Sequence, residues 1–141
     1  MGMPFTLHAG ECGNPQNIID SINVGAGRIG HGIAMRGNRE IRKLAKEAGV
    51  GIEMCPISNL QTKSVNSMAE YPMREFLDAG LKVSVNTDNR TVSNTSLTKE
   101  LEFIQKNYGI RDEEIFRMMK NAIDTAFADD SIKDKICKIL K

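Results

Sequence analysis

The sequence predicts an α/β fold built on a parallel sheet, because of one repeated pattern and because of where its histidines fall. Four times a short apolar or β-branched run leads through a loop containing Gly, Pro or Asn into an amphipathic helical stretch, which is the pattern of βα units. Strands that alternate with helices form a parallel sheet with right-handed crossovers. Both histidines fall at carboxyl ends of predicted strands, where parallel sheets carry their chemistry.

The predicted elements follow one another without a linker of low complexity. The strands are expected at residues 4–8, 27–32, 50–55 and 81–86. Helices are expected to begin near Asn14, Asn38, Ser67 and Ser96, the third ending at residue 79, and two more helices are expected at 112–127 and 130–140. Asn and Ser favour these starts because their side chains accept a hydrogen bond from the first helical turn. The segment "CPISN", residues 55–59, is expected to end the third strand at Pro56 and continue as a tight loop.

The composition of the chain limits which classes of protein it can belong to. The chain has 141 residues, 40% hydrophobic content and a net charge of +1, which predicts one domain with a buried core. Without a block of like charges, neither nucleic acid nor an acidic membrane is indicated as a partner. No apolar run approaches the roughly 18 residues of a membrane span, and no signal peptide is evident, so the expected location is cytoplasmic. Three scattered cysteines favour reduced thiols.

The first strand ends in an unusual group, "TLHAGE". Gly10 allows a sharp turn after the strand, so Glu11 can fold back toward His8. A neutral imidazole binds divalent metals, and a partly desolvated carboxyl can have its pKa raised enough to shuttle a proton. Taken alone, His8 is also consistent with a histidine at the edge of a core.

The second and fourth strands end in further candidates. In "GHG" the flanking glycines leave room for a ligand to approach His31, although a histidine in a turn fits equally well. Asp88 follows a buried-looking strand, so its charge must be paired, solvated or bound to a metal. Asn89 is typical of turn hydrogen bonding. Since zinc usually has four ligands, His8, His31 and Asp88 do not complete a zinc site.

Four motifs follow one another along the chain, "TLHAGE", "RIGHG", "CPISNLQT" and "VNTDN". In the order and spacing of these motifs, the chain resembles the zinc-dependent adenosine deaminases of the amidohydrolase superfamily. The resemblance covers nearly the whole chain but corresponds only to the C-terminal portion of such an enzyme. It implies the C-terminal half of a TIM-like (β/α)8 barrel, with about four parallel strands, their helices and extra C-terminal helices. Residues 1–141 would then form a single partial barrel domain.

This resemblance implies zinc-dependent hydrolytic deamination of adenosine to inosine. His8 and Asp88 would be zinc ligands. Glu11 would pass a proton to the purine ring nitrogen beside the reacting carbon, and His31 would position and help deprotonate the water that zinc binds. Zinc makes such a water available as hydroxide near neutral pH.

The resemblance also implies substrate contacts. Asn89 would bind the purine, at a position where the family usually has a second Asp. A neutral amide can donate a hydrogen bond to the imidazole nitrogen of the purine without needing a proton. Gly10 would lie in the same substrate site. The purine nucleoside is therefore the expected small-molecule partner.

One family feature is absent from the sequence. The His-x-His pair that supplies two zinc ligands does not occur among the two histidines of this chain. Four strands also cannot close a filled barrel. We therefore expect this chain to lack full activity alone, with two open sheet edges, and to need either an N-terminal half or a second copy of itself. An adenine or AMP deaminase, or a non-enzymatic βα domain, are the alternatives.

Overall fold

The sheet has four parallel strands in the order of the chain. A computed structural model describes residues 2–140, and its strands are β1 (Thr6–Ala9), β2 (Arg28–His31), β3 (Gly51–Met54) and β4 (Lys82–Val85). Each strand pairs in parallel with the next, in the order β1-β2-β3-β4. The predicted parallel sheet is confirmed, although each strand is shorter than the sequence pattern suggested.

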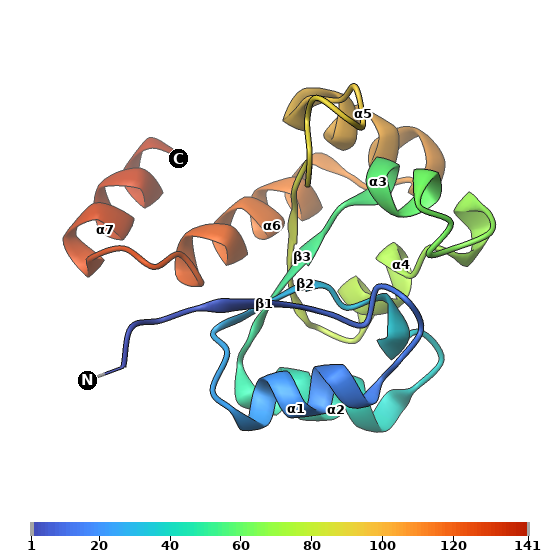
Figure 1. The fold of residues 1–141 in the computed structure, drawn as a ribbon. Helices are drawn as coiled ribbons and strands as arrows, with labels where there is room; N and C mark the ends of the chain where they lie inside the picture. Colours follow the sequence, from blue (N-terminus) through green and yellow to red (C-terminus); the bar gives the residue numbers. More distant parts are fainter. Residues whose placement is uncertain (1, 141) are drawn as a thin grey trace.

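Helices connect the strands and follow the last one. They are α1 (Gln16–Asn23), α2 (Arg39–Ala48), α3 (Pro56–Gln61), α4 (Met73–Asp78), α5 (Leu97–Tyr108), α6 (Asp112–Asp124) and α7 (Asp130–Ile139), with 3₁₀ turns at Ile33–Met35 and Met68–Glu70. Figure 1 shows α1 and α2 side by side below the strands, with α6 and α7 leading away to the left. Within residues 2–140, no helix is long and apolar enough to cross a membrane.

The two faces of the sheet differ sharply in polarity. Side chains alternate along each strand, so paired positions in register line one face together. One face carries an apolar row, and the other carries a polar row one residue further along. The apolar row is Leu7, Ile29, Ile52 and Val83, and the polar row is His8, Gly30, Glu53 and Ser84. The apolar row faces the helices, and in a closed barrel the polar row would face the interior.

The core lies between the apolar face and the helices. Ile18 of α1, Ala45 of α2 and Phe76 of α4 are fully buried and join Ile29 and Ile52 in one cluster. A fully buried aliphatic or aromatic side chain stabilises the fold by about 2 kcal/mol. This packing fixes the strands, and therefore the positions of the polar groups at the ends of the strands.

One helix prediction and one loop prediction are wrong, and proline explains both. The helix expected over residues 67–79 is split into the 3₁₀ turn Met68–Glu70 and α4, because Pro72 lacks an N–H and holds Tyr71 in an extended conformation (ψ 123°). The segment "CPISN" is not a tight loop. It starts α3, with Pro56 at the first helical position, where the missing N–H costs nothing.

The predicted helix starts at Asn14 and Ser96 agree closely with the structure. The Asn14 Oδ1 accepts a hydrogen bond from the Gln16 backbone N–H at 3.0 Å. The Ser96 Oγ accepts one from Lys99 at 3.3 Å. Each side chain satisfies a donor that the helix leaves without an intrahelical partner.

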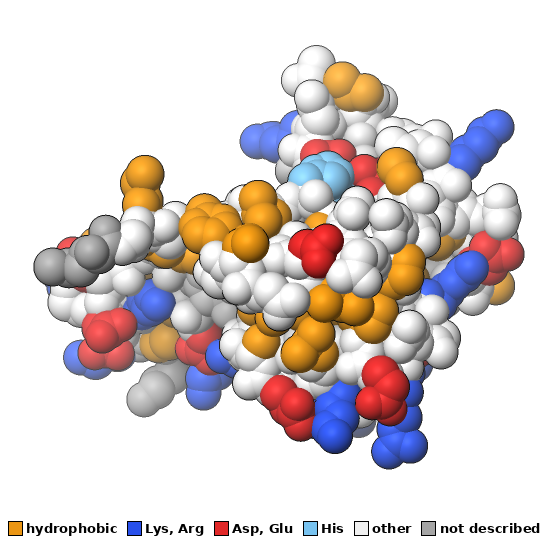
Figure 2. Space-filling view, turned by 60° about the horizontal axis from the view of Figure 1, so that its bottom comes forward, with side chains coloured by type: hydrophobic (Ala, Val, Ile, Leu, Met, Phe, Trp, Pro, Cys, Tyr) orange, Lys and Arg blue, Asp and Glu red, His pale blue; other side chains and the backbone are white. Residues whose placement is uncertain are grey.

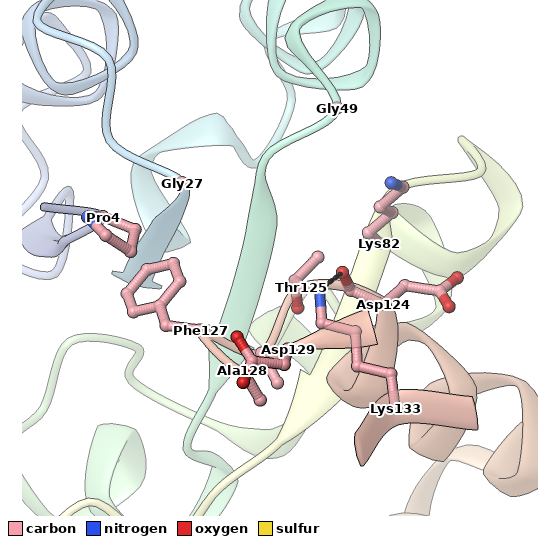
Figure 3. Close-up of a pocket in the computed structure, with 11 residues that line it drawn as sticks. Pro4, Gly27, Gly49, Lys82, Asp124, Thr125, Phe127, Ala128, Asp129 and Lys133 are labelled. Atoms are coloured by element: carbon pink, nitrogen blue, oxygen red, sulfur yellow. Dashed lines mark hydrogen bonds between the residues drawn. The ribbon is translucent and has the colours of Figure 1, made fainter. Parts of the chain in front are cut away.

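Helix α6 covers part of the outer edge of β4. The Asn121 Nδ2 donates to the Val83 carbonyl at 3.0 Å, so the edge expected to be open is partly satisfied within the chain. At the amino ends of the strands, a Cβ added to Gly51 would lie 2.8 Å from the Thr125 Oγ1. The Phe127 ring lies 4.1 Å from the Arg28 guanidinium carbon. Beside these residues is a hollow of about 520 Å³ (Figure 3).

Candidate active site

Gly10 provides the turn that brings His8 and Glu11 together. Its φ is +70°, and a Cβ at this position would lie 2.4 Å from the Ile18 Cδ1. The Gly10 carbonyl accepts a hydrogen bond from Ala34 at 2.8 Å, which fixes the turn against the following βα unit. As a result, the His8 Nε2 lies 2.7 Å from the Glu11 Oε2. The pairing predicted from "TLHAGE" is present.

The carboxylate of Glu11 is surrounded by hydrogen-bond donors. Its Oε1 accepts from the Asn59 Nδ2 at 3.2 Å, the Thr62 Oγ1 at 3.1 Å and the Ser64 Oγ at 3.2 Å. Burial raises the pKa of Glu11, but the hydrogen bond to His8, the charge of His31 and the two hydroxyls together outweigh it. The pKa of Glu11 is therefore lowered in this structure, which is opposite to the raised pKa that the sequence suggested.

His31 is buried at the end of β2 in an unusual backbone conformation. It is 2% exposed and has a φ of 68°, a region that few residues other than glycine adopt. The His31 and His8 ring centroids are 4.1 Å apart. Gly32 does not make room for a ligand as expected, because a Cβ there would lie 2.9 Å from the Met35 Cε within the core. The access to this site lies on the His8 side.

Three side chains form a group that could hold a metal ion. One ligand atom from each of His8, Glu11 and His31 lies within 4.8 Å of the other two. Imidazole nitrogen and carboxylate oxygen suit zinc and related transition metals. The His8 side chain is 61% exposed while that of His31 is 3% exposed, so the group opens toward solvent on one side. On the face shown in Figure 2, histidine surface lies beside acidic side chains.

Asp88 and Asn89 lie apart from this group, after β4. Asp88 has a φ of 54° and accepts a hydrogen bond from the Ser58 Oγ at 2.7 Å. The Asn89 Oδ1 accepts from the backbone N–H groups of Thr91 and Val92 at 3.1 and 3.0 Å. The structure therefore joins Asp88 to α3, and it places Asn89 in the turn that the sequence also suggested for it.

Other polar groups of this end of the sheet were not singled out from the sequence. Thr62 and Ser64 follow α3 and bind Glu11. Glu53 projects from the polar face of β3, where its Oε1 lies 2.8 Å from the Arg28 Nε. A carboxylate within the otherwise apolar strand 50–55 was a usable signal for Glu53, whereas the two hydroxyl residues were typical of any loop.

Comparison with known proteins tests the family resemblance. The family model described as adenosine deaminase matches residues 1–141, the whole chain. The chain belongs to the adenosine deaminase family. It is 50% identical over 127 residues to the adenosine deaminase of Enterococcus faecalis, a match that covers 90% of this chain and 38% of that protein. The chain thus spans about two fifths of the length of its curated relatives.

Two solved structures share the fold. The adenine deaminase of Arthrobacter aurescens superposes with a TM-score of 0.91 at 27% identity, over 97% of this chain and 42% of that one. An amidohydrolase from Burkholderia ambifaria with bound Zn has a TM-score of 0.88 at 26% identity, over 97% of this chain and 39% of that one. The four strands and their helices therefore have the fold of about two fifths of an amidohydrolase TIM barrel.

Proposed function

We propose that this chain supplies one side of the active site of a zinc-dependent adenosine deaminase, which hydrolyses adenosine to inosine and ammonia. The observation that carries the proposal is the convergence of His8, Glu11 and His31, with one ligand atom from each within 4.8 Å of the others. Membership of the adenosine deaminase family over the whole chain supports it. The relatives are more than twice as long as this chain, so the complete activity is attributed to an assembly that includes the remaining part.

Different residues of this chain would transfer a proton, orient water and bind the purine. Glu11 faces the open side of the group with its Oε2, which among residues 2–140 is hydrogen-bonded only to the exposed His8. That oxygen can carry a proton to a purine ring nitrogen, since a carboxylate within hydrogen-bond reach is a suitable general acid–base group. His31 is held rigidly by its burial and can orient a water molecule. The turn uses the Asn89 Oδ1 as an acceptor, and the amide N–H groups of Asn89 would donate to the purine.

The donor set fits zinc. His8, with Asp88 as proposed from the family motif, would hold the ion, and ligand atoms of Glu11 and His31 lie within 4.8 Å of a His8 ring nitrogen. When bound, zinc would supply a Lewis acid that makes water nucleophilic near neutral pH. The remaining ligands would come from outside residues 1–141, because this chain contains no His-x-His pair.

The experiment reconstitutes the assembly from two pieces. This chain is mixed with the part of the Enterococcus faecalis relative that it does not cover, in the presence of zinc, and the release of inosine from adenosine is measured. We expect the mixture to be active and this chain alone to be inactive. Glu11→Gln should lower kcat by about 100-fold or more, whereas the exposed control Glu40→Gln should not. Activity unaffected by Glu11→Gln would contradict the proposal.

Adenine is a second candidate substrate, because the superposed Arthrobacter aurescens structure is an adenine deaminase. The same assembly should therefore be offered adenosine, adenine and AMP in parallel. We expect the highest kcat/KM for adenosine. A preference for adenine or AMP would keep the chemistry and replace the substrate.

A partner can be proposed from the unpaired edge of the sheet at β1. Beyond β1 no further strand pairs with the sheet among residues 2–140, and an unpaired edge is a site for strand addition. We propose that an N-terminal half, or failing that a second copy of this chain, completes the barrel. Light scattering that finds only a monomer at all concentrations, with and without the complementary piece, would reject this.

A further inference from the structure

Asn59 is fully buried at the centre of the candidate site. It lies in α3, is 0% exposed, and its Oδ1 has no hydrogen-bond partner among residues 2–140. A buried amide oxygen without a partner destabilises the fold, because it gives up its hydrogen bonds to water. Leucine or alanine would avoid that cost, so the contacts made by the other half of the amide are the reason to consider a role for Asn59.

The amide nitrogen of Asn59 bridges the two residues proposed to act on substrate and water. Its Nδ2 lies 2.9 Å from the His31 Nδ1 and 3.2 Å from the Glu11 Oε1. An amide nitrogen has two N–H groups, so Nδ2 can donate one hydrogen bond to each partner. The arrangement therefore uses both donors of the side chain.

The carboxylate of Glu11 fixes which way the amide points. If the amide were rotated by 180°, its Oδ1 would face the Glu11 Oε1, and two acceptors would oppose each other. Oε1 also accepts from the hydroxyls of Thr62 and Ser64, so it is bound entirely by donors. The orientation with Nδ2 toward Glu11 is the one that satisfies this cluster.

The orientation of the amide in turn fixes the proton on His31. Because Nδ2 donates to the His31 Nδ1, that ring nitrogen must carry a lone pair, and the neutral ring carries its proton on Nε2. The opposite tautomer would place two N–H donors face to face at 2.9 Å. His31 is 2% exposed, so bulk water does not offer Nδ1 an alternative partner.

We propose that Asn59 is a positioning residue that holds His31 in its Nε2–H tautomer and Glu11 in place beside it. This inference rests on the proposed function and makes it more specific. His31 would then present a hydrogen-bond donor at Nε2 and orient the attacking water, and it would not act as the base that receives the proton of that water. The sequence motif "CPISN" alone did not assign Asn59 any role at the site.

The test reads the tautomer directly in the ¹⁵N-labelled 141-residue chain. Because this chain has two histidines, long-range ¹H–¹⁵N correlation spectra of the rings can be assigned with a single His8→Gln variant. At a pH where the ring is neutral, we expect His31 to show a protonated Nε2 and an unprotonated Nδ1. An Nδ1–H tautomer or a freely exchanging mixture in the unmodified chain would overturn the proposal.

Two variants and one control extend the test. Asn59→Asp replaces the donor with an acceptor, so the proton of His31 should move to Nδ1. Asn59→Ala removes the unpaired Oδ1 together with the donor, adds no charge, and should give a mixture of tautomers. Asn17→Asp adds the same charge at an exposed site on α1 and should leave the His31 spectrum unchanged. Spectra of His31 that are identical in all four proteins would overturn the proposal.

A kinetic measurement separates this inference from the proposed function. In the reconstituted deaminase, Asn59→Asp should lower kcat by about 10- to 100-fold, as loss of an orienting partner does, with little change in KM. If the assembly shows no deaminase activity while His31 keeps the Nε2–H tautomer, the proposed function fails and the positioning role of Asn59 stands. Full activity in Asn59→Asp would reject the role of Asn59 alone.

Discussion

The two ends of the sheet are held together by different kinds of contact. At the carboxyl end, Glu11, His31 and Asn59 are joined by hydrogen bonds of 2.9–3.2 Å or face one another across 3.7 Å, and His31 has a positive φ. At the amino end, Phe127 packs against Arg28 and helix α6 closes over the strands. At the carboxyl end, hydrogen bonds between polar groups thus fix the positions of the side chains. The amino end joins its layers by apolar and cation–π contact.

This difference can be tested by substitution. A change at the carboxyl end should alter the geometry of the His8, Glu11 and His31 group, even where the chain stays folded. A change at the amino end should lower the free energy of unfolding and leave that geometry alone. The four predictions that follow run from the largest expected effect to the smallest.

Gly10→Ala should be the most damaging. The new Cβ would lie 2.4 Å from the Ile18 Cδ1 at a φ of +70°, so backbone strain and overpacking add to a loss of roughly 3 kcal/mol in the free energy of unfolding. Urea denaturation followed by circular dichroism measures it. Gly13→Ala is the matched control, because its φ is +84° but no atom lies within 4 Å of the new Cβ. Equal losses in the two variants would show that contact with Ile18 is unimportant.

Phe127→Ala tests the amino end. The side chain is 40% exposed and its ring lies 4.1 Å from the guanidinium carbon of Arg28, so we expect a loss of about 2 kcal/mol in unfolding free energy from apolar burial and the cation–π contact. Phe127→Leu keeps the apolar contact and should lose less. The ring spectrum of His31 should not change in either variant. A changed His31 spectrum would mean that the two ends are coupled.

Glu114 should make helix α6 sensitive to acid. Hydrogen bonds from the Arg111 backbone and from Arg74 lower the pKa of Glu114 from its ordinary 4.5 to about 2. A lowered pKa in the folded state gives stability that is complete above about pH 4.5 and lost as the pH falls toward 2. Because the pair is screened by solvent, we expect about 1 kcal/mol. Unfolding measured across this pH range should lose that component in Glu114→Gln and keep it in Glu113→Gln.

Asn89→Ala should have the smallest effect. It removes the acceptor for the backbone N–H groups of Thr91 and Val92 in an exposed loop, so we expect a change of about 0.5 kcal/mol. Hydrogen exchange of these two amides should become faster. Asn89→Asp keeps an acceptor, places the usual family residue at this position and should retain the slow exchange. Equally fast exchange in Asn89→Asp would show that the turn does not depend on this acceptor.

The sequence allowed the sheet and the strand ends to be predicted because both depend on local patterns. Short apolar or β-branched runs that lead through loops into helical stretches predicted all four strands, and Gly10 predicted the approach of Glu11 to His8. Pro72 is a local signal too, because it lacks the N–H that the interior of a helix over residues 67–79 needs. At Pro56 the opposite happens, because proline begins α3 where a tight loop was expected.

The contacts that decide the chemistry were harder to predict because they join distant segments. The pKa of Glu11 depends on Thr62 and Ser64 as well as on the two histidines, and no local pattern states that these hydroxyls will face the carboxylate. Desolvation alone pointed to a raised pKa. The pKa is lowered instead because the hydrogen bond to His8, the charge of His31 and the two hydroxyls of the loop after α3 together outweigh desolvation.

Helix α6 has a consequence for how the chain reaches its native state. Its C-terminal end places Thr125 against Gly51 and Phe127 against Arg28, so residues made late in synthesis close over strands made early. Contacts between residues so far apart in the sequence slow folding, since the chain must lose the entropy of the intervening loop before the contact can form. While the ribosome is still adding α6, the amino ends of β2 and β3 stay uncovered and available to other chains. Chaperone dependence and aggregation yield during translation are therefore expected to depend on this helix more than on the residues of the candidate site.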